Sequence, residues 1–358
     1  KPYLRQKVLL PTYPFQRERY WVENQNQKNI SLGHNLDHPL LLSKLSSPID
    51  EAVYSSCLSL KKYPYLQDHQ VFGYLILPGT GLLEMMMAVA VDKLGRASLK
   101  AVHFDVALKL QLDEMSTVQI VLKEDEVGER VTVYSQSHDE HWQEHAHAYI
   151  AHEDIVKVDV IDIDLYRQED YWVDTDNFYL QLSDEGLYYG ESFQAIKSAY
   201  VSDLGFLSKI EVDLDVQDYW AHPALLDSAL HSLMAMQYAL SYDVESMMSS
   251  MPVAIEAVVL LQPLGNTVWV FFKQDEMLYE EKQAVSTGYL LSETGTVLGH
   301  VKGIRAKEVS RTQLLSVIDT KHDKNIDSWF YETVWESKRP FSDKKSSNGE
   351  HWITFGAR

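Results

Sequence analysis

One arrangement of elements occurs twice along this chain, and few folds accommodate it: a strand, a long apolar helix, then several short strands. The first helix is predicted over Thr80–Leu94, with Thr80 as its cap and Gly95 just beyond its end. The second is predicted over Pro223–Leu240, because proline suits a first helical turn. Repetition of this unit predicts an α+β double hotdog, in which two antiparallel sheets each wrap around a central long helix.

Short runs with strand character, bounded by turn residues, flank both helices. In the front half these runs are VYSSCLSL, AVHFDVALKL, TVQIVLKE, RVTVYSQS and HWQEHAHAYIAH. In the rear half they are Ala195–Val201, Leu207–Val216, VVLLQPL, TVWVFFKQ, AVSTGYLLS and VLGHVKGIRAKEV. A loop rich in tyrosine and glycine is predicted ahead of the first rear strand.

Composition divides the chain into five segments. Residues 1–35 are punctuated by prolines and are predicted to be irregular. Residues 36–152 and 171–310 are predicted to be the two hotdog halves, and the acidic residues 153–170 a solvated linker between them. Residues 311–358 form a polar connector that ends in a short predicted strand, HWITFGAR.

Charge and hydropathy exclude some classes of protein. The net charge of −20 disfavours nucleic-acid binding, because too few Lys and Arg are present to neutralise phosphates, and it disfavours an anionic membrane surface. The longest apolar stretch, Leu82–Val91, contains Glu84 and is far too short to span a membrane. Cys57 is the single cysteine, so no internal disulfide is possible. We expect a soluble, cytoplasmic protein.

A first group of polar and turn residues stands in DHQVFGYLILPGTG, directly before the first helix. His69 lies on a predicted loop, Gly73 permits a tight bend, and Pro78 directs the chain into the helix. N–H groups near Gly79 and Gly81 are expected to be free at the helix start, where they would stabilise a thioester oxygen that gains negative charge. A histidine that merely caps a turn would explain His69 equally well on its own.

A second group stands in HPALLDSALH, where Asp227 and His231 are four residues apart and share one helix face. Apolar neighbours on the same helix are Leu226, Leu230, Leu233 and Met234. Because apolar surroundings raise the pKa of a carboxyl, Asp227 is expected to be protonated and able to donate, with His231 orienting it. Taken alone, the pair also fits an ordinary surface contact.

A third group, in EGLYYGESF, consists of Tyr189, Gly190 and Phe193. Gly190 would let the backbone approach a ligand closely, and the two aromatic rings would line a channel. Simple packing explains an aromatic loop as well, so this group has little weight on its own.

Other chemistries have weaker support. His141, His145 and His147 have the same parity, so on a strand they would share a face that a metal could use, although an exposed strand face explains them too. Neither a G-x-S-x-G nucleophile motif nor a glycine-rich phosphate-binding motif occurs. We expect no metal and no cofactor.

Taken in order, the three groups resemble the motifs of dehydratase domains of modular type I polyketide synthases. The family motif H-x-x-x-G-x-x-x-x-P is matched by His69, Gly73 and Pro78. The motif Y-G-x-x-F is matched by Tyr189, Gly190 and Phe193, and D-x-x-x-Q/H by Asp227 and His231. Each motif alone is unspecific, but their order and spacing together are typical of the family.

The flanks extend this resemblance over nearly the whole chain. LPTYPFQRERYW resembles the end of the linker after an acyltransferase domain, and FYETVWES with HWITFGAR resembles the start of a ketoreductase structural region. The chain departs from the family after the second helix, where L-P-F-x-W is replaced by MPVAI. Pro252 is kept and the aromatics are not, which affects the expected shape of the substrate pocket.

The resemblance implies a reaction: removal of water from a β-hydroxyacyl thioester on the phosphopantetheine arm of an acyl carrier protein. It implies His69 as base and Asp227 as acid, facing each other across a dry tunnel, and a homodimer. In a supporting role it implies Tyr189 and His231, with Gly79 and Gly81 N–H groups near the thioester oxygen. The implied substrate-binding residues are Gly73, Pro78, Gly190, Phe193 and Pro252. An isomerase that shifts a double bond and a catalytically silent scaffold are the alternatives.

Overall fold

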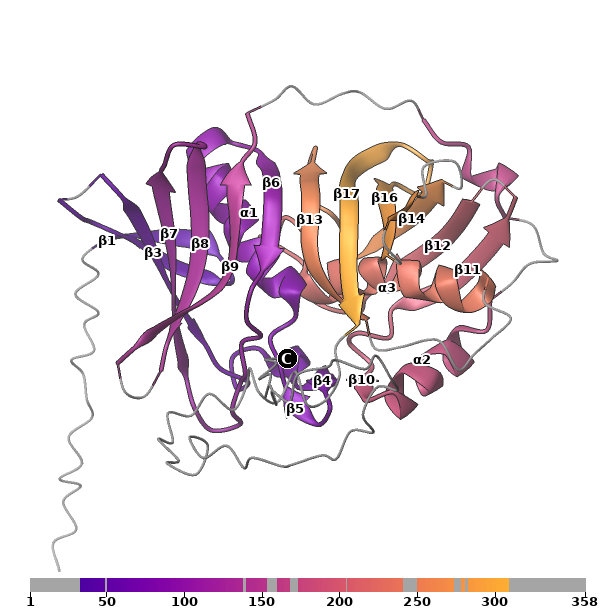
Figure 1. Cartoon of the computed structure of the whole chain (residues 1–358), viewed down its shortest axis with the longest axis horizontal. Coiled ribbons are helices and arrows are strands. Elements are labelled where there is room, and N and C mark those ends of the chain that lie inside the picture. The colour runs from indigo at the N-terminus through magenta and orange to yellow at the C-terminus, as the bar shows by residue number, and fades with distance from the viewer. Residues whose placement is uncertain are drawn as a thin grey trace, which may run out of the picture. The chain divides into compact units, whose positions relative to one another are not determined.

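A computed structural model describes residues 33–308 except 49, 138–139, 153–159, 168–172, 204, 241–249, 274–277 and 281–282 (Figure 1). The described residues belong to one compact unit, Lys1–Asp319. Two predictions lie outside the described residues: the connector 311–358 with its final strand, and residues 1–32 of the first segment. Within the described part of the chain, no helix is long and apolar enough to cross a membrane.

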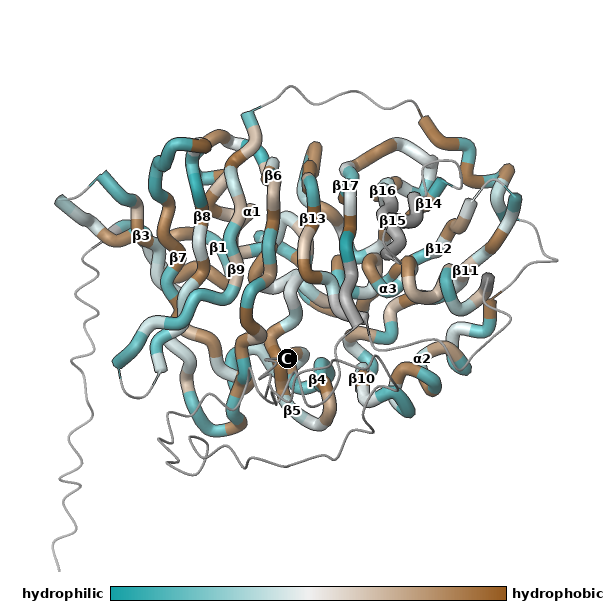
Figure 2. Tube along the Cα trace, viewed as in Figure 1, coloured by the Kyte–Doolittle hydropathy of each residue, from teal (hydrophilic) through white to brown (hydrophobic). Residues whose placement is uncertain are grey.

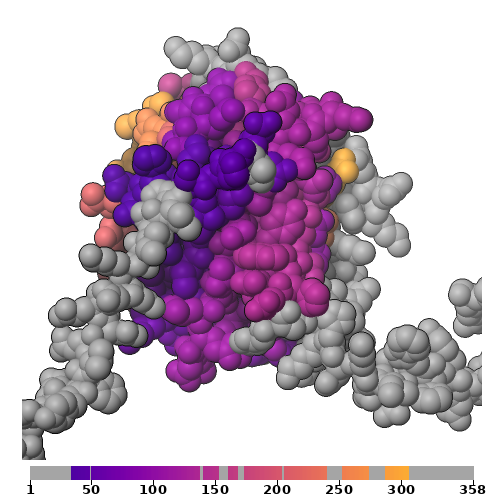
Figure 3. Space-filling model, turned by 90° about the vertical axis from the view of Figure 1, so that its left-hand side faces the viewer, coloured from indigo at the N-terminus to yellow at the C-terminus, as the bar shows by residue number. Residues whose placement is uncertain are grey.

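The front half of the described chain is an antiparallel sheet with the strand order β1-β2-β3-β7-β8-β9-β6. Its strands are β1 Gly33–His38, β2 Leu41–Leu45, β3 Ala52–Leu58, β7 Ser116–Glu124, β8 Glu129–Gln136, β9 Trp142–Ile150 and β6 Ala97–Phe104. Buried residues alternate with more accessible ones along β3 and β7, so one face of the sheet packs on the core. Figure 2 shows the hydropathy of each residue along the chain. Figure 3 shows the surface of this half, where the colour passes from indigo to magenta with increasing residue number.

The rear half repeats the plan with the order β13-β17-β16-β14-β12-β11. Its strands are β13 Ser250–Leu260, β17 Val297–Glu308, β16 Gln283–Leu291, β14 Thr267–Lys273, β12 Gly205–Glu211 and β11 Ile196–Ser202, and β15 Leu278–Glu280 pairs with β16. The two halves are joined edge to edge, because β6 pairs with β13 from Ala97↔Leu260 to His103↔Ala254. One continuous sheet therefore runs through both hotdog halves.

A long helix packs on each half of this sheet. Helix α1, Gly79–Leu94, is buried at every residue from Thr80 to Ala90 and ends at Gly95, whose φ of 73° is the left-handed conformation that glycine favours at a helix end. Helix α3, Pro223–Leu240, packs against β11, β12 and β14. A helix that is apolar on all sides is stable only when it is enclosed, so each sheet must curve around its helix. Both helices start and end as the sequence predicts, to within a residue.

A second, smaller sheet of the order β10-β4-β5 links the two halves. Its strands are β4 His69–Val71, β5 Tyr74–Leu75 and β10 Leu187–Tyr189, and the 3-10 turn η1, Pro64–Asp68, leads into β4. Phe72 and Gly73 form the β4–β5 turn with φ of 50° and 82°, a pair of left-handed residues that suits a two-residue hairpin. Pairing of Tyr189 with His69 brings the third predicted group beside the first.

The structure differs from the sequence expectations in several places. His69, predicted on a loop, begins strand β4, and the tyrosine-rich loop before the rear strands contains β10. Helix α2, Thr175–Asp184, occupies a segment predicted as loop, and the Asp174 carboxylate caps it by accepting from Asn177 N–H. Strand β1 begins inside the segment predicted to be irregular. The acidic linker is not wholly solvated, because η2, Ile163–Leu165, places Ile163 in a buried apolar cluster. Each of these segments gains order from tertiary packing that its own polar composition does not reveal.

Candidate active site

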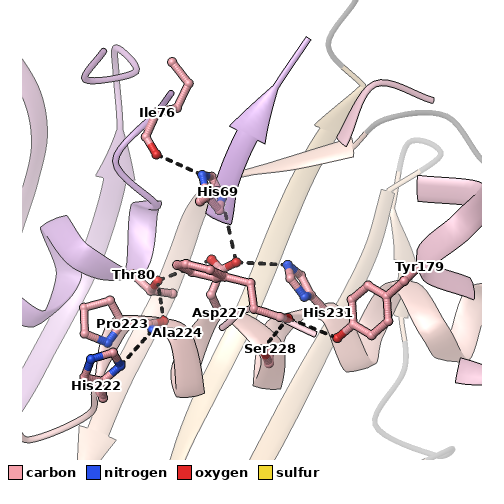
Figure 4. A network of polar contacts seen from close by, with 11 residues as sticks. His69, Ile76, Thr80, Tyr179, His222, Pro223, Ala224, Asp227, Ser228 and His231 are labelled. Carbon is pink, nitrogen blue, oxygen red and sulfur yellow. Dashed lines mark hydrogen bonds and ion pairs between the residues drawn. The ribbon is translucent and has the colours of Figure 1, made fainter. Parts of the chain in front are cut away.

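His69 is the first residue of β4, and its side chain is buried, with the residue 5% exposed. Its Nδ1 lies 2.9 Å from the carbonyl oxygen of Ile76 (Figure 4). A carbonyl oxygen only accepts, so Nδ1 carries the hydrogen and Nε2 keeps its lone pair. The hairpin that holds Ile76 opposite His69 therefore fixes the imidazole in the form that a base requires.

Asp227 lies on α3 in the rear half and is 8% exposed. Its Oδ2 is 3.8 Å from His69 Nε2, so the two side chains point toward one another from opposite halves of the molecule (Figure 4). This distance is too long for a hydrogen bond. The structure thus brings together the two side chains that the sequence singled out, although they are 158 residues apart in the chain.

Two further side chains reach the Asp227 carboxyl group. Thr80 Oγ1 lies 3.3 Å from Oδ1, and His231 Nε2 lies 2.9 Å from Oδ2 at ion-pair distance. The His231 contact is close but poorly directed, and among the described residues Oδ2 has no hydrogen-bond partner of good geometry. The oxygen that faces His69 is therefore the one left available to a substrate.

The pKa of His69 is lowered, which suits the predicted base, whereas the pKa of Asp227 differs from the expectation. Burial lowers the pKa of His69, because loss of water disfavours the charged imidazole, and the nearby Asp227 carboxylate only partly opposes this. Burial alone would raise the pKa of Asp227 and is the largest single influence on it. His231, His69 and Thr80 together outweigh burial, however, so the pKa of Asp227 is lowered. The raised value expected from the apolar helix face is wrong, because polar groups enclose the carboxyl within the same buried site.

Aromatic rings surround the pair. The Tyr189 ring centroid lies 5.4 Å from that of His69 and 4.1 Å from that of His231, and Phe193 lies 5.2 Å from His69. Burial raises the pKa of Tyr189 well above its ordinary value, with the Asp227 charge acting in the same direction. The Tyr189 hydroxyl is therefore neutral and remains a hydrogen-bond donor at physiological pH. Both aromatic residues of the third group therefore lie beside the histidine.

The Tyr189–Phe193 loop is held by Asp68 of the front half. Asp68 accepts from Gly190 N–H at its backbone oxygen, 2.7 Å away, and from Ser192 N–H at its carboxylate, 3.0 Å away. A Cβ atom at Gly190 would collide with the Asp68 carboxylate, so glycine is needed for close approach to the loop that carries His69. Gly190 was expected to let the backbone approach a ligand, but the group that it approaches in the structure is this protein's own Asp68.

The residues at the start of α1 agree only in part with expectation. Pro78 is the N-cap residue and turns the chain into the helix. Its carbonyl oxygen accepts from Gly81 N–H at 2.8 Å, so the expectation of a free N–H at Gly81 is wrong: the first turn of the helix uses it. Gly79 packs against Phe104, and no hydrogen bond from its N–H is found among the described residues. Gly73 shapes the hairpin turn and has open space around it.

Pro252 stands in β13 and pairs with Ala306 of β17, and no described contact joins it to the His69–Asp227 pair.

Sequence reasoning missed two residues that do belong to the site. Thr80, predicted as a helix cap, instead contacts Asp227, and Ser228 Oγ donates to Phe193 O at 2.8 Å. Both could have been suspected from the sequence, because each is a hydroxyl residue that lies close to a motif residue on a largely apolar helix.

The histidines of β9 do not share a face. His145 is the extra residue of a β-bulge, so parity fails there. Its buried Nδ1 lies 2.8 Å from Val106 O and its Nε2 lies 2.7 Å from Ser135 Oγ, while His147 pairs with Asp105 on the surface. A metal site formed by alternating histidines is therefore not supported.

Family models match both halves of the described chain. One, described as a polyketide synthase dehydratase domain, matches residues 38–136. A second, described as a polyketide synthase dehydratase N-terminal domain, matches residues 171–316. Between them they contain His69, Tyr189 and Asp227.

Two curated relatives illustrate the similarity. Polyketide synthase PksM of Bacillus subtilis (strain 168) is 28% identical over 349 residues, which cover 90% of this chain and 8% of PksM. Polyketide synthase GfsB of Streptomyces halstedii is 31% identical over 244 residues, which cover 64% of this chain and 4% of GfsB. The chain thus spans less than a tenth of the length of these relatives.

Solved structures agree with the fold. The dehydratase domain from the CurK module of curacin polyketide synthase is 26% identical, with a TM-score of 0.67 over 77% of this chain and 99% of that one. The domain from the CurF module is 25% identical, with a TM-score of 0.66 over 76% and 99%. CurK dehydratase is also known as two inactive mutants, one with a histidine replaced by phenylalanine and one with an aspartate replaced by asparagine.

These likenesses confirm the predicted double hotdog, and they cover the two halves from which the buried histidine and aspartate come. This chain belongs to the family of polyketide synthase dehydratase domains.

Proposed function

We propose that this domain removes water from a β-hydroxyacyl thioester held on the phosphopantetheine arm of an acyl carrier protein, during polyketide chain elongation. The observation that carries the proposal is the opposed pair of buried groups, His69 Nε2 and Asp227 Oδ2, 3.8 Å apart and drawn from the two halves. Elimination of water needs a base at one carbon and an acid at the next. The inactive histidine and aspartate mutants of CurK dehydratase support the same pairing.

In the proposed reaction the neutral Nε2 of His69 takes the α-proton, which the thioester carbonyl acidifies. The C–H electron pair becomes the new Cα=Cβ bond, and the Cβ–O bond breaks. Asp227 gives its proton to the departing hydroxyl from Oδ2, so the hydroxyl leaves as water. The lowered pKa of His69 keeps its imidazole neutral, which is the form that this step requires.

Asp227 needs a proton before it can act, and its lowered pKa keeps it ionised in the substrate-free site. We propose that the site binds one proton, and that turnover uses the form in which Asp227 carries it. After water leaves, the proton is on His69 and Asp227 is ionised. Return of that proton over the 3.8 Å between Nε2 and Oδ2 restores the starting state.

The remaining residues have assisting roles in this proposal. The Gly79 N–H at the start of α1 would donate to the thioester oxygen as it gains charge. The Tyr189 hydroxyl, kept neutral by burial, would donate to the substrate beside the base. The reaction moves only protons and one water molecule, so we propose that it needs neither a metal nor a redox cofactor, and that chelators leave the rate unchanged.

Incubation with a carrier-bound β-hydroxyacyl thioester, followed by mass spectrometry of the acyl chain, tests the proposal. Loss of one water, about 18 mass units, is the expected result. An enoyl substrate whose double bond moves, with no loss of water from the hydroxyacyl substrate, would favour an isomerase. Absence of reaction with both substrates would favour a silent scaffold and contradict the proposal.

A further inference from the structure

Helix α1 contains a carboxylate in the middle of the core. Glu84 is 0% exposed and stands between apolar residues that are equally buried, Leu83 and Met85. Burial of a carboxylate is costly unless hydrogen bonds replace its water, and an apolar residue would complete this helix without that cost. A buried charge at this position therefore points to a specific set of partners.

Three donors surround the Glu84 carboxylate. Trp220 N–H donates to Oε1 at 2.8 Å, Ala221 N–H donates to Oε2 at 3.0 Å, and His38 Nε2 lies 3.0 Å from Oε1. His38 Nδ1 accepts from Leu40 N–H, so the hydrogen of this imidazole is on Nε2 and points at Glu84. Both carboxylate oxygens are thus satisfied, and two of the three donors are main-chain groups of the rear half.

The main-chain donors are those of the segment that starts the catalytic helix. Trp220 and Ala221 lie just before α3, which begins at Pro223 and carries Asp227 four residues later. One turn earlier on α1, Thr80 Oγ1 lies 3.0 Å from Pro223 O and 3.3 Å from Asp227 Oδ1. Two adjacent turns of α1, through Thr80 and Glu84, therefore form hydrogen bonds with the start of α3 and the residues just before it.

The same helix is tied to the base. Leu77 N–H, just before α1, donates to Leu108 O, and Ile76 next to it holds His69 through its carbonyl oxygen. Any shift of the start of α3 relative to α1 therefore changes the distance between Asp227 and His69. Glu84 is the charged group that opposes such a shift.

We propose that Glu84 is a positioning residue of the dehydration: it anchors the Trp220–Ala221 segment to α1 and so sets the reach of Asp227 toward His69. Glu84 touches no reacting atom and acts only through α3. This inference rests on the proposed function for its kinetic consequence, but its geometric consequence stands independently of any activity.

Glu84→Gln tests the anchor with almost no change of shape. An amide has one accepting oxygen, so one of the two main-chain N–H groups loses its acceptor and faces an N–H donor instead. Misplacement of a reacting group by 1 Å can cost about a hundredfold, so we expect kcat to fall by about that factor. KM should stay within about twofold, because substrate contacts are unchanged. Glu84→Asp, which keeps the charge but shortens the side chain, should lose kcat likewise and serves if the amide variant fails to fold.

His38→Asn is the matched control. Asparagine can still accept from Leu40 N–H two residues on, as an Asx turn does, but it cannot reach Glu84. This variant removes a bond to the same carboxylate without touching the link to α3. We expect it to lower the melting temperature, as Glu84→Gln does, and to keep kcat within about twofold of the wild type.

Crystal structures of the wild type and Glu84→Gln separate the inference from the proposed function. The inference is supported if the distance from His69 Nε2 to Asp227 Oδ2 is longer in the variant than in the wild type and kcat is reduced. An unchanged distance, or equal kcat losses in Glu84→Gln and His38→Asn at equal melting temperature, overturns it. If the wild type does not dehydrate its substrate but the distance still lengthens in the variant, the proposed function fails and the anchor holds.

Discussion

The two hotdog halves use the same scaffold in different ways. Both place a long helix, α1 or α3, against a curved antiparallel sheet, and the two sheets are joined through β6 and β13. In the rear half the helix itself carries a reacting group, Asp227. In the front half the reacting group, His69, sits on a hairpin strand before the helix, while the helix supplies Thr80 and Glu84, which hold the other half. A repeated fold thus provides one catalytic helix and one anchoring helix.

This difference sets what each reacting group depends on. The orientation of His69 depends on a two-residue turn and one carbonyl oxygen, that of Ile76. The orientation of Asp227 depends on helix packing and on contacts from three side chains, Thr80, His231 and His69. Changes in the turn should therefore disturb the base, and changes in the buried polar cluster should disturb the acid.

The largest effect should come from removal of either reacting group. Asp227→Asn and His69→Gln should each lower kcat/KM by about a hundredfold to ten-thousandfold, because each removes one proton transfer of the elimination. Circular dichroism should show an intact fold in both. Tyr188→Phe, at an exposed neighbour of Tyr189, is the control and should keep the wild-type rate. Full turnover by either site variant would end the idea that the two halves divide acid and base between them.

A pH profile of His231→Gln sharpens the comparison on the acid side. Loss of the imidazole removes an influence that lowers the pKa of Asp227, so that pKa should rise. The alkaline limb of kcat/KM, where Asp227 loses its proton, should move to higher pH, and the rate at neutral pH should change by less than about tenfold, because neither reacting group is removed. The acidic limb, where His69 gains a proton, should stay below pH 6.5 in both proteins, because burial lowers the pKa of His69. A shift of the acidic limb alone would contradict this assignment.

Stability should depend on pH through the start of the rear helix. Burial lowers the pKa of His222 from 6.5 to about 4, and its Nδ1 accepts from Ala224 N–H at the start of α3. The unfolded chain binds this proton near pH 6.5 and the folded chain only near pH 4. Stability is therefore full above pH 6.5 and falls as the pH drops toward 4, by up to about 3 kcal/mol from this group.

His222→Asn keeps an acceptor two residues before Ala224 N–H but cannot titrate. Thermal melts between pH 4 and 7 should show a shallower loss of stability in this variant than in the wild type. Some loss should persist, because the pKa values of His69 and His145 are lowered as well. If stability fell equally with pH in the two proteins, His222 would not be a source of the pH dependence.

The smallest effect should come from the turn on the base side. Gly73→Ala should cost about 1 kcal/mol, because alanine resists the φ of 82° even though space is open around it. Gly265→Ala, a glycine with equally open surroundings and no positive φ, should change stability by less than about 0.5 kcal/mol. Urea unfolding measures both. Equal effects would show that the hairpin tolerates a side chain and does not control His69.

Much of the fold was predictable because its two strongest signals are local. An apolar run with a proline or glycine at its end predicted α1 and α3, and three short motifs predicted the residues that meet at the site. Helix α2 was missed because only four of its ten residues, Thr175, Phe178, Tyr179 and Leu182, are buried. Its packing depends on contacts from elsewhere in the chain.

Other misses have the same origin in three-dimensional context. The pKa direction of Asp227 depends first on His231, four residues away, and then on His69 and Thr80, which lie in the other half of the sequence. The hydrogen bond from Gly81 N–H depends on how tightly the first helical turn closes. The failed parity of His145 depends on a bulge that no residue pattern announced. Spacing along the chain identifies partners, but it does not give their electrostatic balance.

The pairing of β6 with β13, which joins the two halves, has a consequence for the engineering of such domains. Its hydrogen bonds are main-chain bonds, so each hotdog half expressed alone would present a full-length strand edge with unpaired N–H and C=O groups. Such an edge invites pairing with another copy, in solution or in an aggregate. Exchanging single halves between dehydratases therefore requires a partner edge of matching register before any catalytic residue matters.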